Sequence, residues 1–67
     1  MKHLDVELAI CMPDGTWHTE VVYVVMADYL AESWLIILSV AIERWSKNNK
    51  DYGQVAIGLY GYRERES

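Results

Sequence analysis

The chain has 67 residues, with ten acidic against six basic side chains and a formal net charge of −4. This length allows one small domain, which we expect to span residues 1–67. The acidic balance opposes nonspecific binding to nucleic acid, which depends on neutralising phosphates with Lys and Arg, so we do not expect a nucleic-acid partner.

So short a chain has little room for a hydrophobic core. It buries about 60% of its unfolded surface, and small domains commonly compensate with disulfides, metals or oligomerisation. Cys11 is the single cysteine, so no internal disulfide can form, and the sequence has no paired spacing of metal ligands. We expect no metal and no cofactor, which leaves association with another chain as the source of further stability.

The sequence also indicates a compartment. The N-terminal MKHLDVELA lacks the long apolar core of a signal peptide, and a lone thiol suits a reducing cytosol. Residues 21–42 are mostly apolar, but Asp28 and Glu32 interrupt them, and a charge in the middle of a membrane is costly. We therefore expect a cytoplasmic protein without a membrane partner.

Residues 3–12 alternate between apolar and polar side chains, which is typical of a half-buried strand. The apolar side consists of Leu4, Val6, Leu8, Ile10 and Met12. Pro13-Asp14-Gly15 follows as a turn signal, because Asp-Gly suits the positive φ angles of a tight hairpin. A second strand is expected over residues 16–26.

The length of the turn decides the register of this hairpin. A two-residue loop at Asp14-Gly15 places Leu8 opposite Val21 and gives every inward residue of the first strand an inward partner. A four-residue loop gives the same pairing, whereas a three-residue loop with a bulge places Leu8 beside Glu20. We favour the first register.

In this register the outer face of the sheet carries apolar residues and acids together, namely Val22, Val24 and Met26 with Asp5, Glu7 and Glu20. Apolar side chains on a face that should meet water indicate a surface covered by a partner. Cys11 and His18 face each other there, and such a pair can form a thiolate nucleophile or part of a zinc site. Two ordinary strand residues are the simpler interpretation, because no third group is placed to orient the pair.

The stretch DYLAESWLIILSVAIERWSK (28–47) has the period of an amphipathic helix. Asp28 is expected to cap its N-terminus, and Asn48-Asn49 to end it. Its apolar side consists of Leu30, Ala31, Trp34, Ile37, Leu38, Ala41, Ile42 and Trp45. Apolar character also spreads to Ile36 and Val40 beyond this side, which gives the helix more apolar surface than one small sheet can cover.

A third strand is expected over residues 54–63, after a polar turn at 48–53. Its inward side consists of Val55, Ile57 and Leu59, and Tyr60 and Tyr62 share the other side. Aromatic strands can stack RNA bases, but the charge balance opposes this use, so we interpret the two tyrosines as anchors for a protein contact.

Strand, strand, helix, strand predicts an α+β domain whose three-stranded, mainly antiparallel sheet carries the helix on one face. The third strand can lie beside the first or the second through a right-handed crossover. We favour the order 2-1-3, which makes the sheet fully antiparallel. Trp34 and Trp45 are expected in the core. Trp17, near the hairpin tip, can cap the core or stand exposed, and we favour the core.

These patterns favour a small acidic module that binds a larger protein, as an inhibitor or an adaptor. Chains of this size and charge include phage-encoded inhibitors of host defence such as anti-CRISPR proteins, a likeness of composition that no motif carries. The residues expected to bind the partner are Val22, Val24, Met26, Ile36, Val40, Tyr60, Tyr62, Glu7 and Glu20.

Two other functions remain open. The chain can be a structural homo-oligomer, such as a homodimer, whose apolar residues meet those of symmetry mates. It can also be an acidic DNA mimic, although a net charge of −4 is thin for reproducing a dense line of phosphates. An enzyme is not expected, because so small a domain has little room within one subunit for a pocket of about 300 Å³.

Overall fold

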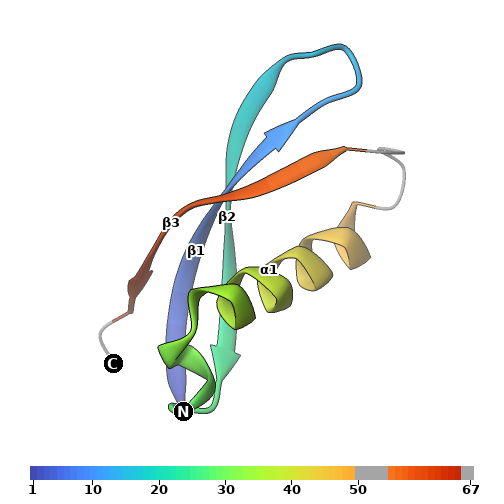
Figure 1. Cartoon of the computed structure of the whole chain (residues 1–67). Helices are drawn as coiled ribbons and strands as arrows, with labels where there is room; N and C mark the ends of the chain where they lie inside the picture. Colours follow the sequence, from blue (N-terminus) through green and yellow to red (C-terminus); the bar gives the residue numbers. More distant parts are fainter. Residues whose placement is uncertain (50–54, 66–67) are drawn as a thin grey trace.

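A computed structural model of the chain describes residues 1–49 and 55–65. Three strands form one antiparallel sheet in the order β2-β1-β3, with β1 at Lys2–Cys11, β2 at Trp17–Met26 and β3 at Ala56–Glu64. A short 3-10 helix, η1 (Leu30–Glu32), leads into α1 (Trp34–Asn48), which lies across one face of the sheet (Figure 1). The predicted α+β class and strand order are confirmed, while the turn predicted at 48–53 lies mostly outside the described residues.

The core lies between α1 and the sheet face beneath it. Every second residue of β1 is buried there, because the central strand has neighbours on both sides and a helix above it. The buried side chains are Leu4, Val6, Leu8 and Ile10 of β1, Val24 and Met26 of β2, and Ile37, Ala41 and Trp45 of α1. From β3, Ile57 and Leu59 pack against this core as predicted.

The β1–β2 hairpin has a three-residue loop, so the favoured two-residue register is wrong. Leu8 lies opposite Glu20, as in the bulged alternative. Pro13 gives the reason: in a two-residue loop it would occupy a ladder position that needs a backbone N–H, and proline has none. At the second position of a turn its fixed φ fits, and Gly15 then takes a φ of +89°.

Hydrogen bonds around the loop complete this geometry. The Gly15 amide donates to the Met12 carbonyl at 2.9 Å, and the Met12 amide donates to the Thr16 carbonyl at 2.8 Å. The Asp14 carboxylate accepts bonds from the Thr16 hydroxyl and amide, at 2.6 and 2.9 Å, and these bonds lower the pKa of Asp14. The result is a turn followed by a glycine bulge, the common form of a three-residue hairpin.

The one-residue shift exchanges the two faces of β2. Val24 and Met26 are buried and Val22 packs against the core, so the prediction that these three lie on the outer face is wrong. Trp17 and Val21, which were expected inward, are 64% and 63% exposed. Both now lie on the sheet face turned away from α1, and the loop end of the hairpin also reaches beyond α1 (Figure 1).

Gly15→Ala is expected to lower the free energy of unfolding by about 1–2 kcal/mol, because an L side chain strains a left-handed backbone. Nothing lies within 4 Å of the added methyl group, so the loss measures backbone strain alone. Denaturant titration gives the value. Gly58→Ala is the matched control, since it adds the same methyl in open space where φ is not positive. Equal losses in the two variants would contradict the loop geometry.

The start of α1 differs from its prediction. It begins at Trp34 rather than near residue 28, with Ser33 at the cap position, and Asp28 pairs instead with the N-terminal amine at 3.1 Å. Trp34 is 53% exposed, so its expected core position is wrong. Side chains of a helix lean toward its N-terminus and cover the turn before them. Trp34 is the first residue of α1, so α1 has no earlier turn for it to pack on.

In the described parts of the chain, no helix combines the length and apolar character needed to cross a membrane.

Candidate functional site

The sheet face turned away from α1 is covered by no element that the structure describes, and we call it the open face. The antiparallel register assigns its residues, because side chains alternate along each strand. They are His3, Asp5, Glu7, Ala9 and Cys11 of β1, Trp17, Thr19, Val21, Tyr23 and Val25 of β2, and Ala56, Gly58, Gly61 and Arg63 of β3.

Strand β2 makes the open face apolar. Trp17, Val21 and Val25 are all exposed there, and their spacing of four residues points them in the same direction. Single exposed hydrophobic residues are common on protein surfaces. Three on one face of one strand, with Thr19 and Tyr23 between them, form a row of exposed apolar side chains, which is the kind of surface that a partner covers.

Arg65 organises one end of the open face. Its guanidinium donates to Asp5 at 2.6 and 3.2 Å and lies over the ring of Tyr23, 4.3 Å from the centroid. The Tyr23 hydroxyl is hydrogen-bonded to the ring of His3, on which Tyr23 also stacks. The bond to Asp5 raises the pKa of Arg65. Sequence reasoning missed Arg65. The Arg65 backbone amide pairs with the His3 carbonyl, and this contact between the two ends of the chain brings the Arg65 side chain to Asp5.

A hollow of about 470 Å³ lies in the open face, lined by Asp5, Glu7, Val21, Tyr60, Gly61, Tyr62, Arg63 and Arg65. The expectation that so small a domain lacks a hollow of this size is therefore wrong. Its charges have both signs, and the Asp5 carboxylate is already bound by Arg65. Glu7 makes no hydrogen bond or ion pair with any other described residue, so its carboxylate is free to meet a partner.

A bulge in β3 separates the two tyrosines. The pairing of β1 with β3 shifts by one residue at Tyr60, which has no opposite residue on β1. Tyr62 lies opposite Val6, a core residue, so the pairing does not place the two tyrosines on one strand face as predicted, although both border the hollow. The extra residue reverses the alternation along the strand. Tyr60 is 69% exposed and borders the hollow beside Glu7.

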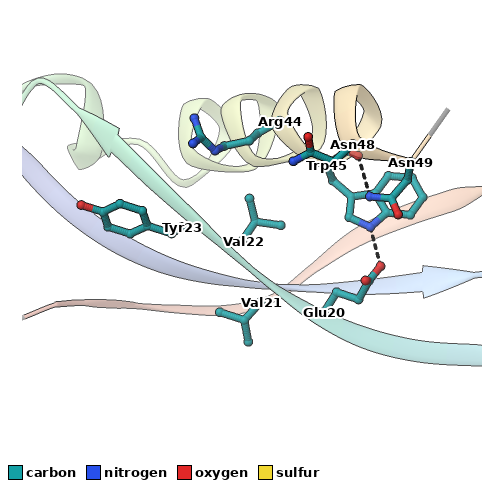
Figure 2. Close-up of a pocket in the computed structure, with 8 residues that line it drawn as sticks. All are labelled: Glu20, Val21, Val22, Tyr23, Arg44, Trp45, Asn48 and Asn49. Atoms are coloured by element: carbon teal, nitrogen blue, oxygen red, sulfur yellow. Dashed lines mark hydrogen bonds between the residues drawn. The ribbon is translucent and has the colours of Figure 1, made fainter.

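Glu20 does not join the other acids. It lies on the helix side of the sheet and accepts a hydrogen bond from the indole N–H of Trp45 (Figure 2). The expected grouping with Asp5 and Glu7 is therefore wrong. The core position of Trp45 is confirmed, and the carboxylate gives its polar N–H the partner that a buried indole needs.

The Cys–His pair does not form. Cys11 lies opposite Trp17 and His18 lies opposite Ile10, which places the thiol and the imidazole on different faces of the sheet. Within residues 1–49 and 55–65, no group of three or more His, Cys, Asp or Glu side chains is arranged to hold a metal ion.

Comparisons with protein-family models, with curated proteins and with solved structures find no match for this chain. The chemistry of its own surfaces therefore carries the functional interpretation.

A second apolar surface lies at the start of α1, where Trp34, Leu35 and Ile36 are exposed. Val40, expected to share this surface with Ile36, is half-buried against the core. Consecutive residues of a helix point in different directions, so these three cannot meet one flat partner together. The open face presents its apolar residues in one direction and is the stronger candidate for a binding site.

Between β2 and α1 runs a shallow channel that we call the edge groove. It consists of two hollows of about 270 and 180 Å³, and Arg44 lines both of them. Figure 2 shows the larger one, with Arg44 extending from α1 above β2. Arg44 has no hydrogen-bond or ion-pair partner in the part of the chain that the structure describes. The groove thus combines free space with an arginine that makes no ion pair among the described residues, and an acid also lines each hollow, Glu20 in the larger and Glu43 in the smaller.

Proposed function

We propose that this chain is a small protein-binding module that acts in the cytoplasm as an inhibitor or adaptor, by covering a site on a larger protein. The observation that carries this proposal is the exposed stripe of Trp17, Val21 and Val25 on the open face. Trp and Tyr are enriched among the residues that dominate binding energy at interfaces. Trp17 and Tyr60 are therefore the expected anchors of the contact.

Polar groups surround this stripe, as they do at the rim of protein interfaces. Glu7 and Arg63 border the hollow and have no partner among the described side chains, so they can pair with charges on another protein. Rim charges of this kind influence the rate and selectivity of association more than its affinity.

The charge pattern favours protein binding over DNA mimicry. A mimic needs a line of uncompensated acids in place of phosphates. Among the described residues, acids pair with bases on the surface, as in Asp5–Arg65, Lys2–Glu64 and Glu43–Lys47. The potential of such a surface is mixed rather than uniformly negative.

Paired substitutions test the proposal. The tagged chain is used to capture proteins from cells that naturally produce it, and the affinity for the captured partner is then measured with the purified components. Trp17→Ala and Tyr60→Ala are each expected to weaken binding by about tenfold or more, because truncating a hot spot costs at least about 1–2 kcal/mol.

Trp34→Ala and Tyr29→Ala are the matched controls. They remove the same two types of exposed side chain outside the three strands, Trp34 at the first position of α1 and Tyr29 just before η1. Both are expected to keep the affinity of the unmodified chain. The proposal fails if the unmodified chain captures nothing above background, or if the control variants lose binding while the open-face variants keep it.

A further inference from the structure

Strand β2 forms an outer edge of the sheet, and Glu20, on the helix side, is the one Asp, Glu, Lys or Arg along it. Natural proteins protect edge strands with Lys, Pro, bulges or short length. The ten residues of β2, WHTEVVYVVM, pair regularly with β1 and contain no Lys, Arg, Pro or Gly. A long, regular and apolar edge of this kind is a template for another strand.

The ladder geometry identifies the free backbone groups on this edge. In antiparallel pairs, hydrogen-bonded and non-hydrogen-bonded positions alternate. The bond from the Met12 amide to the Thr16 carbonyl sets the phase, and the bond from the Arg65 amide to the His3 carbonyl agrees with it. The residues of β2 whose N–H and C=O groups point away from β1 are therefore Trp17, Thr19, Val21, Tyr23 and Val25.

The other outer strand is protected. β3 contains Gly58 and Gly61, a bulge at Tyr60, and the charged residues Arg63 and Glu64 near its end. A bulge breaks the regular spacing of donors and acceptors, and charges on an edge disfavour pairing with another chain. Only one of the two outer strands is thus suited to extending the sheet.

We propose that β2 pairs antiparallel with β2 of a second copy of this chain, about a two-fold axis at Val21, to form a continuous six-stranded sheet. The strand is complementary to itself in this register. Val21 faces Val21, Thr19 faces Tyr23, and Trp17 faces Val25 of the second copy. These are the β-branched and aromatic pairs that stabilise antiparallel sheets, and no charged residue faces a like charge.

Charges on the helix side support the same register. Glu20 of the second copy lies opposite Val22, which lines the larger hollow of the edge groove together with Arg44. The Glu20 carboxylate, which accepts the indole N–H of its own Trp45, then lies near the guanidinium of Arg44 across the axis, and the two-fold axis repeats this arrangement. The hollows show that α1 leaves room for these side chains beside β2.

The pairing also enlarges the open face. Two copies join their stripes of Trp17, Val21 and Val25 into one surface across the six strands, without burying the face itself. This association does not depend on the proposed binding of a larger protein. It would, however, present that protein with a doubled apolar surface.

The first test is the mass of the purified chain in solution, measured by light scattering over a range of concentrations. A dimer of twice the 7.8 kDa monomer is expected. Val21→Lys places two positive charges against each other on the axis and is expected to give a monomer. Ala56→Lys adds the same charge to the open face on β3 and is expected to remain dimeric. A monomeric unmodified chain overturns the proposal, and so does dissociation by Ala56→Lys, which would indicate stacking of open faces.

Cross-linking gives a second test that does not require a destabilising change. In a Cys11→Ser background, Val21→Cys places two thiols on facing residues about 5.5 Å apart between Cα atoms, within the range of a disulfide. Val25→Cys places its two thiols about 27 Å apart, eight residues along the strand. Mild oxidation is expected to link the first variant and not the second. Equal linking of both variants, or none of the first, would overturn the register.

Discussion

Val24→Asp is expected to unfold the domain. Val24 is 1% exposed and lies opposite Leu4 in the core, so the new carboxylate would be buried without a partner. Burial of an unpaired charge is among the few single changes that cost more than about 4 kcal/mol. Small domains have stabilities near the lower end of about 5–15 kcal/mol, so little folded protein should remain. Circular dichroism during thermal melting measures the loss.

Val25→Asp is the matched control, because it makes the same substitution one residue later on the open face. Val25 is 42% exposed, and water can solvate the new carboxylate there. We expect a change in unfolding free energy within about 1 kcal/mol, as for other surface substitutions. In the two-residue register the two results would be exchanged, so a stable Val24→Asp with an unfolded Val25→Asp would refute the observed hairpin.

Trp45→Ala is expected to reduce the free energy of unfolding by about 3–5 kcal/mol, the range found when a buried aromatic residue is truncated. The side chain is 5% exposed, and its removal also takes the indole donor away from Glu20. Trp34→Ala provides the comparison, because Trp34 lies on the same helix but is largely exposed. Denaturant titration of both variants should give a clearly larger loss for Trp45. Similar losses would show that α1 is rotated relative to the described packing.

Trp45→Phe separates the two contributions of this residue. It keeps most of the apolar volume and removes the N–H group that donates a hydrogen bond to Glu20. A hydrogen bond to a charged group contributes about 1.5–3 kcal/mol, so the loss should fall below that of Trp45→Ala. A loss equal to that of Trp45→Ala would instead mean that the hydrogen bond, rather than packing, holds α1 against β2.

The fold could be predicted from the sequence because its strongest patterns are unambiguous. β1 alternates over its whole length, so its core face follows from Leu4, Val6, Leu8 and Ile10. The apolar period of α1 and the alternation of side chains in β3 then leave few possible orders of the three strands. The fully antiparallel order, which we favoured, is the observed one. The local sequence pattern was sufficient to predict the buried face of an element wherever its other face is clearly polar.

The binding surface could not be placed in the same way, because β2 is apolar on both faces. Val22, Val24 and Met26 on one side compete with Trp17, Val21 and Val25 on the other, so alternation alone cannot choose. The missing N–H of Pro13 excludes the two-residue loop, but a four-residue loop keeps the same pairing, so Pro13 alone does not choose the register. Tyr62 was misplaced for a related reason, since a single bulged residue reverses every later position of β3.

Both proposals for this chain concern β2 and use different parts of it. The side chains of Trp17, Val21 and Val25 form the apolar stripe of the open face, while the backbone groups of the same residues form the free edge. A partner on the face and a second copy at the edge can therefore be accommodated together. Each depends on the odd-numbered residues of β2 pointing away from α1.

The hairpin register is the claim on which the binding surface depends, and one nuclear Overhauser measurement tests it most directly. Facing residues at non-hydrogen-bonded positions of an antiparallel pair bring their Cα atoms to about 4.5 Å, and their Hα atoms closer still. The observed register places Glu7 opposite Val21, so a strong Hα–Hα signal is expected between these two residues. A strong signal between Leu8 and Val21 instead would mean that Trp17, Val21 and Val25 face α1, which would contradict the proposed binding surface.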